Sequence, residues 1–137
     1  MNADFLDAHL RHWEDAELLW EAQHWANADH LYGLSAECGL KRLMLAFGMS
    51  VDTEGVPTKR DKVHADAIWQ RFESYRLRHS RGAYYLLPAD SPFADWHVSQ
   101  RYARRSDFTE IHVKPHRNGA KAIFDSIRKA RWEGLVP

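Results

Sequence analysis

One arginine and one histidine late in the chain have the residue types and the spacing that RNA cleavage could use. Residues 101–113 read RYARRSDFTEIHV, and six residues separate Arg105 from His112. Near neutral pH, a histidine can take the proton from a ribose 2′-hydroxyl or protonate the leaving oxygen. The planar fork of an arginine can stabilise the negative charge that develops on the phosphate. The pair is therefore a candidate for metal-independent cleavage of RNA.

Spacing alone is weak evidence for this pair. The chain holds thirteen arginines and nine histidines. With that composition, chance produces about two to three Arg–His pairs separated by four to six residues, so the motif has a high false-positive rate. Only one such pair occurs here. Whether the two residues work together must therefore be judged from the sequence segments that contain them.

Further candidates lie around this pair and on an earlier helix. Other basic residues could hold an RNA backbone, namely Arg101, Lys114, His116 and Arg117. Glu37 and Lys41 are four residues apart in a helical pattern. They are either an ordinary surface pair, worth about 0.2–0.5 kcal/mol, or part of a polar strip that orients a cleft. The sequence leaves both readings open.

Metal and cofactor motifs are not evident. His9 and His12 could share a helical face, and His112 and His116 are close together in the sequence, but neither pair comes with an evident third and fourth ligand. No glycine-rich phosphate loop and no nucleophile elbow is present. We therefore expect no metal and no cofactor. Cys38 is the single cysteine, so we expect an inert core thiol and no internal disulfide, which fits a reducing cytoplasm.

The net charge is zero, but the charges are unevenly distributed. Residues 1–37 contain eight acids and one base, whereas residues 38–137 contain eighteen bases and eleven acids. Either each part has a solvated face of its own sign, which we slightly favour, or a basic surface binds a polyanion. The first residues do not resemble a secretory signal, and the apolar runs are too short to span a bilayer. We expect a cytoplasmic protein without membrane contact.

The hydrophobic pattern is helical nearly throughout, without the alternation of strands. It predicts one domain, residues 1–137, folded as an all-α antiparallel bundle of four to five helices. The expected helices cover about 4–25, 27–47, 63–79, 93–105 and a last segment from Pro115 or Asn118 to about Trp132. This arrangement puts His112 in the loop before the last helix.

The helix expected over 27–47 has apolar residues on two faces, so we expect it at the centre of the bundle. Gly39 within it costs roughly 1 kcal/mol relative to alanine, which a close helix crossing would justify. Gly48 fits the left-handed residue that ends a helix.

Two segments carry a resemblance to a known family. ADHLYGLSAECGLKRLMLAFG contains an Ala-Glu pair followed by Leu-Lys, at Ala36, Glu37, Leu40 and Lys41. DWHVSQRYA contains Trp96, Val98, Arg101 and Tyr102. Both segments, and the order of the helices, resemble those of HEPN domains, which are small helical bundles associated with RNA cleavage and nucleotide binding.

The resemblance implies a function and partners. In active HEPN domains an arginine, four to six further residues and a histidine carry RNA cleavage, and Arg105 and His112 match this motif. The family typically forms homodimers in which two motifs build one cleft. Many members act in toxin–antitoxin or defence systems beside a nucleotidyltransferase antitoxin. A homodimer also fits the aromatic residues of the irregular segments, which would otherwise expose apolar surface: Tyr84, Tyr85, Phe93 and Trp96.

Three interpretations follow from these observations. We slightly favour a metal-independent endoribonuclease of a toxin–antitoxin or defence system, with Arg105 and His112 as catalytic residues. The alternative is a noncatalytic HEPN-like module that binds a nucleotide or a protein partner. A more distant third is a structural helical domain whose acidic and basic faces pair in a dimer.

Overall fold

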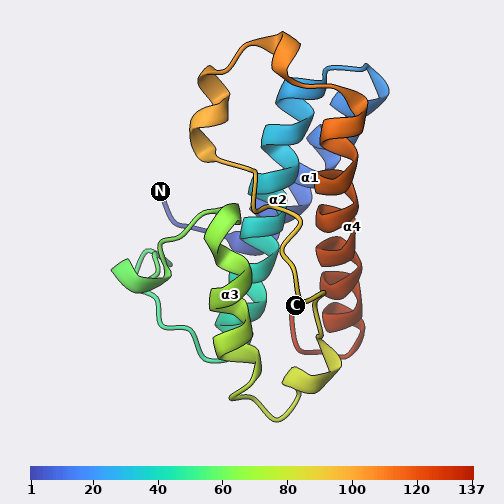
Figure 1. Cartoon of the computed structure of the whole chain (residues 1–137). Coiled ribbons are helices and arrows are strands. Elements are labelled where there is room, and N and C mark those ends of the chain that lie inside the picture. Colours follow the sequence, from blue (N-terminus) through green and yellow to red (C-terminus); the bar gives the residue numbers. More distant parts are fainter.

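Four α-helices pack as a bundle in the computed structural model, which describes all 137 residues (Figure 1). The first two helices are antiparallel, as expected, but the second, third and fourth run in the same direction, so the bundle as a whole is not antiparallel. The helices are α1 (Phe5–Glu21), α2 (Trp25–Ala46), α3 (Ala65–Arg76) and α4 (Glu110–Trp132). Short 3-10 turns lie in the connections, namely η1 (Lys59–Asp61), η2 (Gly82–Tyr84), η3 (Val98–Tyr102) and η4 (Arg105–Asp107). There is no sheet, so the predicted all-α bundle is confirmed.

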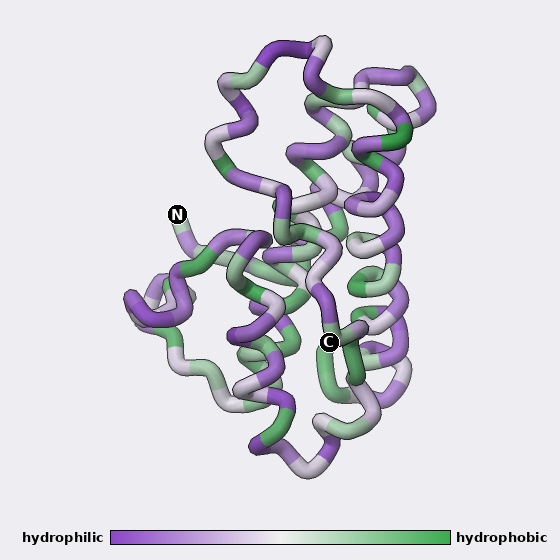
Figure 2. Tube along the Cα trace, viewed as in Figure 1, coloured by the Kyte–Doolittle hydropathy of each residue, from purple (hydrophilic) through white to green (hydrophobic).

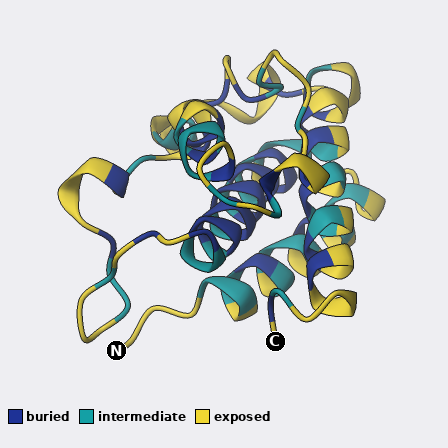
Figure 3. Cartoon of the chain, turned by 90° about the horizontal axis from the view of Figure 1, so that it is seen from below, coloured by how far each residue is buried: buried dark blue, intermediate teal, exposed yellow.

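Helix α2 is the centre of the bundle, as its two apolar faces predict. It contacts α1, α3, α4 and two of the 3-10 turns. The buried residues gather on it, as Figure 3 shows, and one complete stripe of them is Ala28, Tyr32, Ala36, Leu40, Leu43 and Phe47. The outward sides of the helices and the segment between η3 and α4 are mainly hydrophilic (Figure 2). Burial of the apolar residues around α2 is the main driving force for folding.

The predicted helix crossing at Gly39 is confirmed. A Cβ atom there would lie 2.5 Å from Ile123 Cγ2 on α4 and 2.7 Å from His9 Nδ1 on α1. Only a residue without a side chain lets three helices approach this closely. The helix ends as expected, because Gly48 has a left-handed φ of 108° directly after it. Burial raises the pKa of the neighbouring Cys38 thiol to about 12, which keeps it protonated and inert.

The helix predicted over 93–105 does not form. This region contains only the η3 turn and the start of η4, and the chain around it is irregular. The reason is tertiary: the indole of Trp96 is buried against α2, where a Cβ on Gly33 would lie 2.0 Å from Trp96 Cε2. The segment is thus held by a side chain inserted into the bundle instead of by its own helical hydrogen bonds.

The last helix begins earlier than predicted, at Glu110. Thr109 caps it, since its hydroxyl oxygen accepts a hydrogen bond of 3.2 Å from the His112 amide. Pro115 lies inside the helix and cannot donate to the carbonyl of Ile111. Ile111, whose carbonyl loses this partner, is 86% exposed. The expectation that His112 lies in a loop is therefore wrong, because it belongs to the first turn of α4.

The aromatic residues of the irregular segments are mostly covered by the chain itself. Tyr85, Phe93 and Trp96 are buried, and only Tyr84 is exposed. The apolar surface that we expected a dimer to cover is therefore largely internal. Other large apolar side chains are exposed instead: Leu18, Leu77, Leu86, Tyr102, Ile111 and Trp132. No helix has the length and apolar character needed to cross a membrane.

The crossing at Gly39 leads to a stability prediction. Gly39→Leu should lower the free energy of unfolding by about 1–3 kcal/mol, because the new side chain overpacks the contact among three helices. Chemical denaturation measures this loss. Glu14→Leu, at an exposed position of α1, is the control and should change stability by less than about 0.5 kcal/mol. Equal stability of the Gly39 variant and the wild type would contradict the tight crossing.

Candidate functional site

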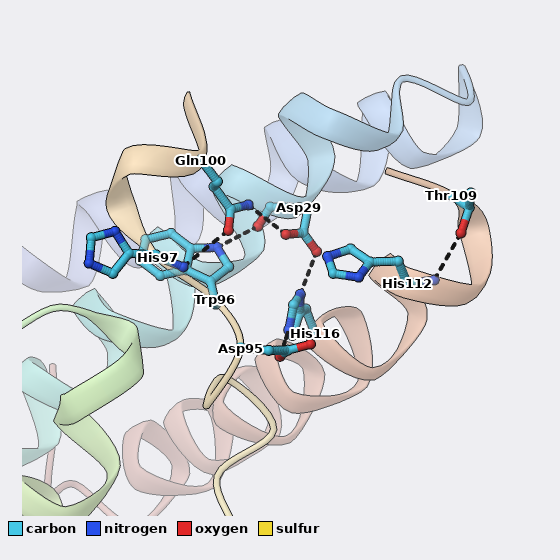
Figure 4. A network of polar contacts seen from close by, with 8 residues as sticks. All are labelled: Asp29, Asp95, Trp96, His97, Gln100, Thr109, His112 and His116. Atoms are coloured by element: carbon cyan, nitrogen blue, oxygen red, sulfur yellow. Dashed lines mark hydrogen bonds and ion pairs between the residues drawn. The ribbon is translucent and has the colours of Figure 1, made fainter. Parts of the chain in front are cut away.

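A buried histidine joins three parts of the chain at one end of the bundle (Figure 4). His116 on α4 is 1% exposed. Its Nδ1 lies 2.5 Å from Asp29 Oδ1 on α2, and its Nε2 lies 2.7 Å from Asp95 Oδ1 in the segment before η3. Through its two nitrogens, the ring therefore links α4 both to α2 and to the irregular segment before η3.

These bonds determine the protonation of His116. Burial by itself disfavours the charged ring, but the two carboxylates outweigh burial and raise the pKa of His116 above its ordinary value. Burial would also raise the pKa of Asp95, and the bond from His116 reverses this and lowers it. Both ring nitrogens donate when the carboxylates are ionised, so His116 is a buried imidazolium. Because the Asp95 side chain is 68% exposed and that of Asp29 is fully buried, Asp29 is the stronger partner.

Asp29 also holds the irregular segment through its remaining acceptors. Gln100 Nε2 donates to Asp29 Oδ2 at 2.6 Å, and Trp96 Nε1 donates to the Asp29 backbone oxygen at 3.0 Å. The ring of His30 stacks on Trp96, with centroids 5.8 Å apart. One residue of α2 thus positions the segment 95–100 against both α2 and α4.

His112 lies on the open side of this network. It is one turn before His116 on α4, and the two ring centroids are 5.4 Å apart with the rings nearly perpendicular. Phe108 contacts the His112 ring at a centroid distance of 5.6 Å. Unlike Asp29 and His116, His112 is partly exposed. A histidine that solvent can reach, next to a fixed ion pair, is well placed to exchange protons with a ligand.

Arg105 lies at the same end of the bundle as His112 but has different surroundings. It is exposed in η4, which contacts α2 and precedes α4 by two residues (Figure 1). It lines a pocket of about 520 Å³ whose other walls are Ala103 and residues 22–27, between α1 and α2. No hydrogen bond joins Arg105 to His112. The structure therefore brings Arg105 and His112 to one end of the molecule without a hydrogen bond between them.

Glu37 and Lys41 form a buried ion pair, so the surface-pair reading is wrong. Their side chains are about 10% exposed, at 10% and 9%, and the charged atoms are 2.8 Å apart. His64, before α3, places its Nδ1 3.2 Å from Glu37 Oε2. Glu37 is two turns of α2 from Asp29, about 12 Å along the axis, so this pair is separate from the His112 network.

The four residues expected to hold an RNA backbone divide into two kinds. Arg101 and Lys114 are exposed and remain available to a ligand. Arg117 is engaged, because its fork donates two hydrogen bonds of 2.8 Å to the Glu17 carboxylate. His116 is buried and both of its nitrogens have partners, which argues against a direct contact with RNA.

Sequence reasoning missed Asp29, the residue at the centre of the site. A signal was present, since Asp29 directly follows Ala28 in the helix predicted to be the most buried, and a buried carboxylate requires a partner. The fold also supplies a third possible metal ligand, which the pair His112 and His116 lacked in the sequence. One ligand atom each of Asp29, His112 and His116 lie within 4.8 Å of one another, a grouping that could hold a metal ion.

The two carboxylates on His116 allow a matched comparison. Asp29→Asn should lower the free energy of unfolding by about 3 kcal/mol or more, because it leaves the buried imidazolium without its counter-charge. Asp95→Asn removes a carboxylate that is mostly exposed, and should cost less than about 1 kcal/mol. Denaturant titration in the presence of EDTA measures both variants. Equal losses from the two variants would show that burial does not decide the strength of these bonds.

Comparisons with known protein families, with curated proteins and with solved structures find no match to this chain. The resemblance to HEPN domains therefore stays a prediction.

Proposed function

We propose that the protein is a metal-independent endoribonuclease of the HEPN type, with His112 and Arg105 as its catalytic residues. The observation that carries the proposal is the position of His112. It is a partly exposed histidine in the first turn of α4, beside the buried Asp29–His116 pair. This pair fixes the first turns of α4 against α2 and so limits the movement of His112. A positioned acid–base group typically contributes about 10²–10⁴-fold to a rate.

The chemistry needs one proton taken and one proton given. The ribose 2′-oxygen loses its proton and attacks the phosphorus, the bond from phosphorus to the 5′-oxygen breaks, and that oxygen gains a proton. His112 supplies the acid or the base. Arg105 stabilises the charge that develops on the phosphate oxygens, after the RNA closes the distance between the two residues. The products are a 2′,3′-cyclic phosphate and a free 5′-hydroxyl.

The substrate we propose is single-stranded RNA. Arg101 and Lys114 are exposed near the two catalytic residues in the sequence and have no carboxylate partner. They would contact backbone phosphates, which position the strand without reading its bases. Binding should then weaken as the salt concentration rises.

The proposed assembly is a homodimer, with a nucleotidyltransferase antitoxin as a candidate partner of a toxin–antitoxin or defence system. Ile111 and Tyr102 support an interface at this end of the bundle. They are 86% and 79% exposed, and each lies within three residues of a catalytic candidate. A second copy packed here would cover both side chains and bring two active sites together.

One observation favours the alternative, a noncatalytic module that binds a nucleotide. Arg105 lines its pocket together with Trp25 and Asn27 and away from the His112 network. An aromatic ring and an arginine in one pocket can hold a base and a phosphate without any chemistry. In that case His112 would serve the structure of the α4 terminus.

Cleavage assays separate these two functions. The wild type should cut single-stranded RNA in EDTA and leave 2′,3′-cyclic phosphate ends. His112→Ala should reduce cleavage about 10²–10⁴-fold while RNA binding survives, since phosphate contacts supply most of the affinity. Arg105→Lys should also lose most activity, because lysine keeps the charge but not the fork.

His64→Ala, at an exposed position before α3, is the control and should cut RNA like the wild type. Sedimentation of the same samples reports the oligomeric state. A folded dimer that cleaves none of a varied set of RNAs would overturn the nuclease proposal. Nucleotide binding that is lost in Arg105→Ala and kept in His112→Ala would then support the binding module.

A further inference from the structure

The cluster of Asp29, His112 and His116 has the composition of a metal site. His112 and His116 are four residues apart on α4, so their rings project from one face of the helix in successive turns. Asp29 faces them from α2 (Figure 4). One donor atom from each of the three lies within 4.8 Å of the other two. Two imidazoles and one carboxylate with an open position are a common ligand set for zinc and related metals.

We propose that Asp29, His112 and His116 bind a divalent transition metal ion, with zinc as the best match. Two ligands come from one rigid helix and the third from the helix packed against it, so the ligands are largely in place before the ion arrives. His112 is partly exposed and provides the route by which the ion enters. The fourth position would hold water.

Neighbouring residues already orient two of the three ligands. Asp95 accepts a hydrogen bond from His116 Nε2, which turns Nδ1 toward Asp29. Gln100 holds Asp29 Oδ2, which leaves Oδ1 on the side of His116. A carboxylate that accepts from the far nitrogen of a histidine is the usual support for a metal-bound imidazole. A surface cluster formed by accident would lack this second layer of contacts.

One local change is needed for binding. Asp29 Oδ1 and His116 Nδ1 are 2.5 Å apart, and the proton on Nδ1 lies between them. Metal–ligand bonds of about 2.0–2.2 Å require the two atoms to separate by roughly an ångström. The proton between them leaves to solvent, and the ion takes its place with the same two partners.

Metal binding would also control the proposed nuclease, and this part of the inference rests on the proposed function. An imidazole bound to a metal uses the lone pair that would otherwise accept a proton, so it can act neither as the base nor, once protonated, as the acid. Zinc at this site would therefore occupy His112 and stop RNA cleavage. The cluster would then act as an inhibitory site, with catalysis confined to the metal-free protein.

Titration of the untagged, metal-free protein with Zn²⁺ alone tests the site, with calorimetry as the readout. We expect one ion per chain. His112→Ala should weaken binding at least tenfold, and Asp95→Asn, which removes only the supporting carboxylate, should weaken it about 10–100-fold. His64→Ala is the control and should bind like the wild type. Absence of binding to the wild type, or equal binding to His112→Ala, would overturn the site.

Cleavage assays with added zinc distinguish this inference from the proposed function. Inhibition that follows the occupancy measured by calorimetry supports both. If the ion binds as expected and RNA is still cut at saturation, the metal site stands and the catalytic role of His112 is wrong.

Discussion

The hydrogen-bonded ion pair between Asp29 and His116 is the constraint on which the rest of this end of the structure depends. The two residues are 87 positions apart and both are fully enclosed. Neither charge can be buried without the other, because an unpaired buried charge costs several kcal/mol. The fold must therefore bring α2 and α4 together in the one register that pairs them. His112 takes its position from that register.

Small residues allow the irregular segment to reach the same place. Trp96 packs on Gly33, and a Cβ on Gly119 would lie 2.5 Å from Pro92 Cγ. The chain between α3 and α4 thus crosses the bundle between Gly33 on α2 and Gly119 on α4. This path delivers Asp95 and Gln100 to the buried pair. Apolar packing and the polar network are two parts of one arrangement, since the segment would lack an anchor without either.

The sequence predicted those parts of the fold that depend on local pattern. The apolar stripes of α2, its central place and the crossing at Gly39 follow from periodicity and from the cost of a glycine in a helix. The missing helix over 93–105 and the early start of α4 do not, because each depends on a competing interaction. Insertion of Trp96 into the bundle prevents the predicted helix, and the Thr109 cap together with the burial of Val113 and His116 starts α4 before Pro115.

The residues of the candidate site also differ in whether the sequence alone identifies them. His112 and Arg105 stand out by residue type, since few side chains can exchange a proton near neutral pH or bind a phosphate with two parallel hydrogen bonds. Asp29 has no local signature, because its partners Trp96, Gln100 and His116 lie 67, 71 and 87 residues away. Its role exists only after folding, and so does the proposed metal site that it completes.

The most direct test of this account is the protonation of His116. Heteronuclear NMR spectra of the imidazole rings, recorded on the metal-free protein at neutral pH, report whether each ring nitrogen carries a proton. We expect both nitrogens of His116 to be protonated, as the bonds to Asp29 and Asp95 require. A neutral His116 with one bare nitrogen would contradict the buried ion pair and the positioning of His112 that depends on it.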